Sequence, residues 1–142
     1  MEAPDRVQRP VPPLHGAADV VRFVRATLAN TTYASRAAIV VIGLDEAHRP
    51  VGLAENRRRW SLRSCTSQEL AALAAQLDAR SLVLVQFVPN KRRSPSVADA
   101  YVFRGLARRC AAECTPVLDC IVVSAERWWS LAHLAAVAAV SN

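Results

Sequence analysis

Apolar positions along this chain follow two spacings, and their order predicts helices that alternate with strands. Within residues 16–30 the apolar residues recur every three or four positions and leave Arg22 and Arg25 outside, which indicates an amphipathic helix. Three other segments are short, continuous apolar runs rich in β-branched residues, a pattern typical of buried strands. These runs cover residues 37–44, 82–85 and 117–123.

Polar segments between these runs predict where further elements begin. The polar turn at 45–50 predicts that residues 51–54 return as the second arm of a hairpin. Alternation across residues 60–62 favours a short edge strand. A capping box at residues 66–69 predicts the start of a helix that runs to about residue 78.

Two more helices are predicted towards the C-terminus. One runs from residue 96 to about residue 113 and is expected to bury a stripe formed by Val102, Leu106 and Cys110. The other is a short Ala-rich helix over residues 131–140.

Length and composition indicate one folded unit. A chain of 142 residues with 52% hydrophobic content can bury one sizeable core. Residues 1–15 are proline-rich and charged, so we predict a flexible tail there and a single domain over residues 16–142. No apolar run of about 18 residues and no signal-peptide segment is found, so we expect a cytoplasmic protein without a membrane partner.

The charge of the chain favours anionic partners. Its formal net charge is +6 and its isoelectric point is about 9.9, and arginine carries almost all of the positive charge. Such a balance suits polyanions or acidic protein surfaces without choosing between them. A composition rich in arginine and alanine is equally compatible with a GC-rich genome.

Four cysteines are spaced unlike any zinc ribbon or finger, although the second and third would share a helix face. They are Cys65, Cys110, Cys114 and Cys120. We expect buried thiols that act as small apolar residues, and the spacing leaves open whether any of them binds a metal.

Residues 82–99, LVLVQFVPNKRRSPSVAD, combine a predicted strand, a basic loop and a helix that begins at Ser96. Ser96 and Asp99 by themselves fit a helix N-cap with a carboxylate in the first turn, where the helix dipole favours it. The segment also resembles the JAMM (JAB1/MPN) metallopeptidases, most closely their RadC-like branch. That family has H-x-H-P before the loop and P-S-x-x-D after it, and both histidines and the aspartate bind zinc.

This motif matches without a gap, except at the histidines. The matching residues are Pro89, Pro95, Ser96, Ala98 and Asp99. The two histidine positions hold Gln86 and Val88.

Other segments extend the resemblance. Residues 116–119 match the family's P-V-L-D-H-x-I-V, with Cys120 where histidine is usual, and residues 128–131 resemble its terminal strand. The family's general-base glutamate would fall near Ala37, where this chain has no carboxylate. The resemblance implies an α/β fold: a single JAB1/MPN-like (cytidine-deaminase-like) domain with a mixed central β-sheet flanked by helices.

The substituted ligands change the expected chemistry. Zinc catalysis needs about three protein ligands and a base near the bound water. Gln86 is a weak neutral ligand and Val88 is none, so Asp99 alone is not expected to hold the ion. We therefore expect no bound metal, no cofactor and no enzymatic activity, and we expect Ser96 and Asp99 to serve as a structural cap.

Basic residues near the motif suggest a binding role. They are Arg57, Arg58, Arg59, Arg63, Lys91, Arg92 and Arg93. If they converge, the former catalytic edge becomes a cationic surface. Our first hypothesis is a catalytically inactive JAMM/MPN-like domain that acts as a binding or scaffold module and uses this surface to hold an acidic protein segment or nucleic acid.

Three alternatives remain open. The first is a RadC-like nucleic-acid-binding protein in DNA repair or a mobile element, and the second is a scaffold or homodimer that pairs through Trp128, Trp129 and the C-terminal helix. The third is an enzyme with an altered site that uses Ser96, Asp99 and either Cys120 or Gln86.

Overall fold

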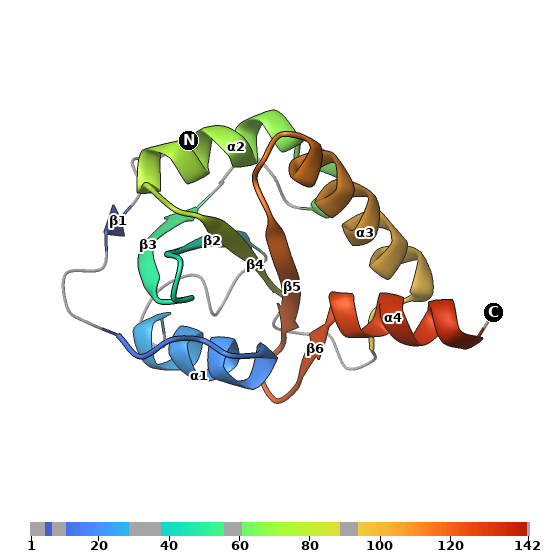
Figure 1. The fold of residues 1–142 in the computed structure, drawn as a ribbon. Helices are drawn as coiled ribbons and strands as arrows, with labels where there is room; N and C mark the ends of the chain where they lie inside the picture. Colours follow the sequence, from blue (N-terminus) through green and yellow to red (C-terminus); the bar gives the residue numbers. More distant parts are fainter. Residues whose placement is uncertain (1–4, 7–10, 29–37, 56–60, 89–93, 142) are drawn as a thin grey trace.

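A mixed sheet of six strands forms the centre of the computed structural model, in the order β1-β3-β2-β4-β5-β6 (Figure 1). The structure describes residues 5–6, 11–28, 38–55, 61–88 and 94–141. The strands are β1 (Asp5–Arg6), β2 (Ala38–Leu44), β3 (Pro50–Glu55), β4 (Ser81–Phe87), β5 (Val117–Val123) and β6 (Trp128–Ser130). Strands β4 and β5 are parallel, and all other neighbours are antiparallel. The predicted mixed α/β sheet is therefore confirmed.

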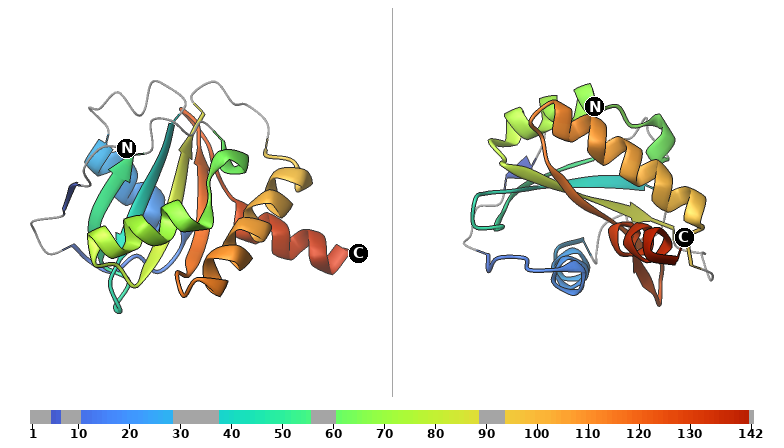
Figure 2. Two further views of the ribbon diagram at one scale, coloured as in Figure 1. Left: turned by 90° about the horizontal axis from the view of Figure 1, so that it is seen from above. Right: turned by 45° about the vertical axis from the view of Figure 1, so that its right-hand side comes forward.

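Helices cover both faces of this sheet. They are α1 (Ala17–Leu28), α2 (Ser67–Leu77), α3 (Val97–Ala112) and α4 (Leu131–Ser141), with a 3-10 turn, η2 (Leu62–Ser64). The right-hand view of Figure 2 shows α2 and α3 on one side of the sheet and α1 on the other. Helix α4 packs on α3 and β5. None of the helices in the described part of the chain is long and apolar enough to span a bilayer.

Two apolar clusters follow from the alternation of side chains along the strands. In β4, Leu82 and Leu84 join the cluster under α2 and α3. Val83 and Val85 point the other way and join the cluster under α1. The same strand thus contributes to both halves of the core.

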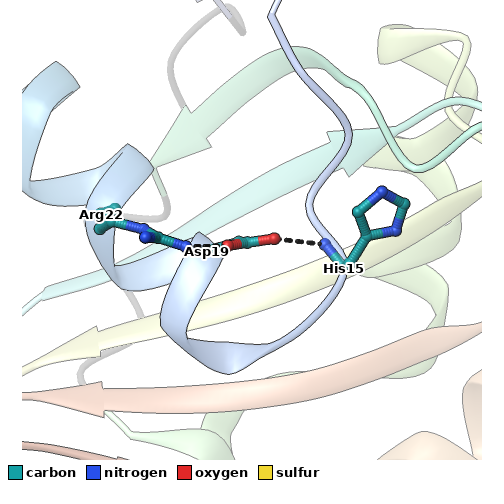
Figure 3. Close-up of polar contacts among 3 residues, drawn as sticks. All are labelled: His15, Asp19 and Arg22. Atoms are coloured by element: carbon teal, nitrogen blue, oxygen red, sulfur yellow. Dashed lines mark hydrogen bonds and ion pairs between the residues drawn. The ribbon is translucent and has the colours of Figure 1, made fainter.

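The start of α1 is held by Asp19, as Figure 3 shows. Its Oδ2 accepts a hydrogen bond from the His15 backbone N–H at 2.9 Å, and its Oδ1 pairs with Arg22. The hydrogen bond from His15 and the one from Arg22 lower the pKa of the Asp19 carboxyl. This bond ties His15, the residue before the N-cap position Gly16, to the first turn of α1.

Parts of the predicted N-terminal tail contact the domain. Asp5 and Arg6 pair with Leu53 and Gly52 of β3. Leu14 is buried, and its N–H donates to the His48 carbonyl at 2.8 Å. Residues 1–15 thus contain packed structure at β1 and at Leu14, which differs from the flexible tail expected there, while the flexibility of the remaining residues stays a prediction.

Two local predictions are wrong. Ser61 and Leu62 form no edge strand, because the chain turns into η2 there and buries Leu62 and Cys65, three residues apart, on one side. Along α3, Phe103 lies on the buried stripe with Leu106, whereas Val102 is half-buried. Packing against both the sheet and α4 decides which side of α3 is covered, and periodicity alone does not contain that information.

Candidate functional site

A cavity of about 230 Å³ opens where β4 ends and α3 begins. Its walls come from the end of β4, the start of α3, the turn η2, the end of β5 and the first residue of α4. We call it the β4–α3 cavity. It is lined by Ser61, Leu62, Arg63, Gln86, Val88, Pro95, Asp99, Val102, Val122 and Leu131.

Strand geometry brings Gln86 and Val88 to this cavity. Leu84 faces the cluster under α2 and α3, and Gln86 and Val88 follow at the two-residue spacing that keeps side chains on one face. Within the sheet, Gln86 lies beside Ile39 of β2 and Val122 of β5. The two positions expected from the sequence motif therefore lie together.

Asp99 reaches the same cavity from the first turn of α3. Its carboxylate Oδ2 accepts from the Ser96 N–H at 3.0 Å, and the Asp99 N–H donates to the Ser96 Oγ at 3.2 Å. These reciprocal bonds are a complete capping box. The predicted structural cap is confirmed, and it determines where Asp99 lies.

Arg63 is the one member of the predicted basic surface that the described residues include. It is exposed on η2 and lines the cavity. The other six, Arg57, Arg58, Arg59, Lys91, Arg92 and Arg93, lie outside the described residues. In sequence, however, only Trp60 separates the first cluster from the lining residue Ser61, and the second cluster lies between the lining residues Val88 and Pro95.

The order of these residues agrees with a family match over most of the chain. The family model of the RadC-like JAB domain matches residues 14–136. This chain belongs to the RadC-like JAB domain family. The resemblance inferred from the motif and the expected fold are both confirmed. None of the curated proteins matches the chain.

The donors present in this RadC-like JAB domain do not fit the zinc ion that the family implies. At the three ligand positions Gln86 offers an amide, Val88 an aliphatic group and Asp99 a carboxylate that already accepts from Ser96. The Arg63 guanidinium lines the same cavity, and its positive charge opposes a second cation. Across the described residues, no group of three or more His, Cys, Asp or Glu side chains could hold a metal ion.

The described residues near the position of the family's general-base glutamate also include no carboxylate on β2. Strand β2 begins at Ala38 and carries no carboxylate through Leu44. Ala37, where the resemblance places the glutamate, lies outside the described residues. The chain's three histidines, His15, His48 and His133, are all exposed and line no part of the cavity.

Asp119, which matches the family's P-V-L-D sequence, has a structural role at the start of α4. Its Oδ2 accepts from the Ser130 hydroxyl at 2.6 Å, and its Oδ1 accepts from the N–H groups of Cys120 at 2.7 Å and Ala132 at 3.0 Å. Burial raises the pKa of the Asp119 carboxyl, although these hydrogen bonds oppose the shift. The network anchors the start of α4 and with it Leu131, which lines the cavity.

Three of the four cysteines contribute apolar packing to this domain, and the expected burial is wrong for the fourth, Cys114. Cys65, Cys110 and Cys120 are buried in the cluster under α2 and α3, as predicted. Burial raises the pKa of the Cys110 thiol and, more strongly, that of Cys120. Cys114 is exposed and follows the end of α3 in a left-handed conformation with φ 58°. The prediction that Cys110 and Cys114 share a helix face is therefore wrong.

Proposed function

We propose that this RadC-like JAB domain has no metallopeptidase activity and that the face around the β4–α3 cavity binds an acidic protein segment. One observation carries the proposal. The cavity at the family's metal position is lined by an amide, an aliphatic side chain and an exposed guanidinium, those of Gln86, Val88 and Arg63.

Charge supports an anionic ligand at this face. Arg63 lines the cavity, the chain as a whole carries a net charge of +6, and both basic clusters are joined in sequence to lining residues. Asp99 is the carboxylate at the cavity, and its bond with the Ser96 N–H offsets part of its charge. A surface of this kind attracts anions and raises their association rate.

The lining favours a peptide over a nucleic acid. Six of the ten lining residues are apolar, including Leu62, Val102 and Leu131, and they suit one apolar side chain of a ligand. No aromatic residue is among those that line the described cavity, so a platform for base stacking has no support there. The ligand that fits is an acidic segment with an aliphatic side chain.

The test measures fluorescence anisotropy of a labelled peptide in which aspartates and glutamates surround one leucine. Single-stranded and duplex DNA of similar charge serve as competing probes. Arg63→Glu is expected to weaken peptide binding by about tenfold or more, because it replaces attraction at the cavity by repulsion. Arg25→Glu makes the same charge change on an exposed position of α1, across the sheet, and is expected to have little effect.

Two results would oppose the binding proposal. Absence of peptide binding at low salt would remove it. DNA binding that exceeds peptide binding and is lost in Arg63→Glu would favour the nucleic-acid alternative.

The non-enzymatic part is tested separately by elemental analysis of the purified protein. Less than about a tenth of an equivalent of zinc or iron is expected, since one carboxylate and one amide are a poor donor set. Stoichiometric metal would contradict this part of the proposal and favour an enzyme with an altered site.

A scaffold that pairs with a second copy is the second candidate. Strand β6 pairs only with β5 within the sheet order and presents Trp128, which is 38% exposed. An exposed tryptophan on an edge strand is a plausible contact in a dimer. Light scattering that finds only monomers at the highest soluble concentration would exclude this candidate.

A further inference from the structure

A second surface of the domain lies between α3 and α4 and shares no lining residue with the β4–α3 cavity. It is a groove of about 480 Å³, which we call the α3–α4 groove. Its floor is made of small side chains at helical spacing, such as Ala107 on α3 and Ala132 and Ala136 on α4. Small side chains let another backbone approach closely.

Helix α4 is almost entirely apolar, and although Leu131 and Ala135 are buried, much of its outer side is exposed. Apart from His133 and Ser141 it consists of alanine, leucine and valine, and Val137 and Val140 are 49% and 88% exposed. A helix that is apolar all round is normally buried. The left-hand view of Figure 2 shows α4 projecting from the sheet beyond the other elements. Exposed apolar side chains gathered on one helix, as on α4, are typical of a surface that a partner covers.

The charged residues that line the groove are both positive, and both belong to α3. Arg104 and Arg108, one helical turn apart on α3, line it, and α4 contributes no charged residue. Neither arginine forms an ion pair within the part of the chain that the structure describes. No carboxylate is among the residues that line the groove.

We propose that the α3–α4 groove binds an amphipathic helix of another protein, with its apolar side chains on the alanines and its carboxylates beside Arg104 and Arg108. A volume of about 480 Å³ falls in the usual range of ligand sites. An apolar helix face in an apolar groove is a common mode of peptide recognition. The arginine pair selects an acidic helix.

A second copy of this chain fits the groove less well. Pairing the same surface of two copies around a two-fold axis brings like surfaces together. That arrangement places four arginines in one interface, Arg104 and Arg108 from each copy, and α4 supplies no carboxylate to pair with them. Like charges at an interface cost binding free energy.

The test compares two fluorescein-labelled synthetic helical peptides. Both carry leucine and alanine on one face, and the flanks of that face carry glutamate in one peptide and lysine in the other. By fluorescence anisotropy with the full chain, the glutamate peptide is expected to bind at least about tenfold more tightly. Arg104→Glu with Arg108→Glu is expected to reverse this preference.

Two controls separate the groove from the rest of the surface. Arg25→Glu with Arg49→Glu makes the same charge change at exposed positions that do not line the groove, and is expected to leave the preference intact. Ala139→Phe fills the groove from an exposed helix position and is expected to weaken binding of the glutamate peptide with unchanged circular dichroism.

Three results would overturn the proposal. Equal affinity for the two peptides would indicate non-specific apolar adhesion. Unchanged binding in the double arginine variant would place the peptide elsewhere. A dimer in light scattering that Val140→Glu dissociates would show that a second copy covers this surface.

Discussion

Asp99 occupies the position of a family zinc ligand, yet its carboxylate accepts from the Ser96 N–H and caps α3. The cap explains why the aspartate suits this fold even where the other ligand positions are an amide and an aliphatic group. The cap gives Asp99 a structural role that does not require a bound metal.

Placing histidines at the two motif positions tests whether the cavity has a geometry that can hold zinc. Gln86→His with Val88→His is expected to bind about one zinc ion per chain, because both imidazoles would lie on the strand face at the cavity that Asp99 also lines. Equilibrium dialysis with metal analysis measures it. Adding Asp99→Asn removes a charged ligand while keeping an acceptor for the cap, and should weaken binding. A double-histidine variant that binds no more zinc than the unmodified chain would contradict the expectation.

The buried carboxyl of Asp119 predicts a pH effect of defined sign. Its pKa is raised above the ordinary value of 3.8, so the folded state binds the proton more tightly than the unfolded state does. Its contribution to the free energy of unfolding is therefore favourable at low pH and is lost as pH rises from about 3.8 through the raised pKa. Urea unfolding of the unmodified chain and of Asp119→Asn across this range measures the difference between them, which should fall as pH rises.

Asp19 is the matched control because its pKa is shifted the other way. The His15 N–H and Arg22 lower its pKa, so its stabilising contribution is present above the ordinary value and is lost as pH falls through the lowered pKa. The difference in the free energy of unfolding between the unmodified chain and Asp19→Asn should therefore rise with pH. If the two differences, for Asp119→Asn and for Asp19→Asn, changed with pH in the same direction, the opposite pKa shifts of the two carboxyls would be contradicted.

At the scale of elements, capping chemistry determines where α3 starts. Ser96→Ala removes the acceptor for the Asp99 N–H and is expected to lower the free energy of unfolding by about 1 kcal/mol. Ser94→Ala, at an exposed position before the cap, should change it by less than about 0.5 kcal/mol. Urea denaturation measures both, and equal losses would argue against the cap.

The glycines Gly43 in β2 and Gly105 in α3 differ in how closely neighbouring side chains approach them. A Cβ on Gly43 of β2 would lie 2.9 Å from the Ala79 Cβ and 3.0 Å from Leu77 Cδ1, so Gly43→Ala should cost roughly 1–3 kcal/mol. A Cβ on Gly105 in α3 would meet only Arg109 Nη1, at 3.5 Å. Gly105→Ala should therefore stabilise the domain by roughly 0.5–1 kcal/mol through helix propensity. Thermal unfolding distinguishes the two, and a shift of the same sign in both would contradict the packing argument.

At the scale of the whole molecule, two separate surfaces are each proposed to bind an acidic ligand, and arginines line both of them. Raising the salt concentration from about 0.05 to 0.5 M should lower the affinity of the β4–α3 cavity for the proposed acidic peptide. The reason is that screening then limits the attraction between exposed charges to a few ångström. Urea stability should change far less, since the core is apolar. Affinity that does not depend on salt would indicate that apolar contacts alone hold the peptide.

The order of elements was predictable because it depends on local periodicity. The runs at 37–44, 82–85 and 117–123 became β2, β4 and β5 with ends shifted by at most a few residues. The 3-10 turn at Leu62 and the burial of Phe103 in place of Val102 were not predictable, since each depends on which neighbour covers that side.

The sequence by itself determined the alternation of helices and strands, the cap of α3, the motif shared with RadC-like JAB domains and the substitutions at its ligand positions. All of these are local, because they depend on residue type and on spacing along the chain. Only the tertiary structure brought Arg63 to the cavity with Gln86 and Asp99, tied Asp119 to the start of α4 and left the apolar α4 beside two arginines. Contacts between residues far apart in sequence depend on how the sheet orders its strands, and spacing along one segment does not encode that order.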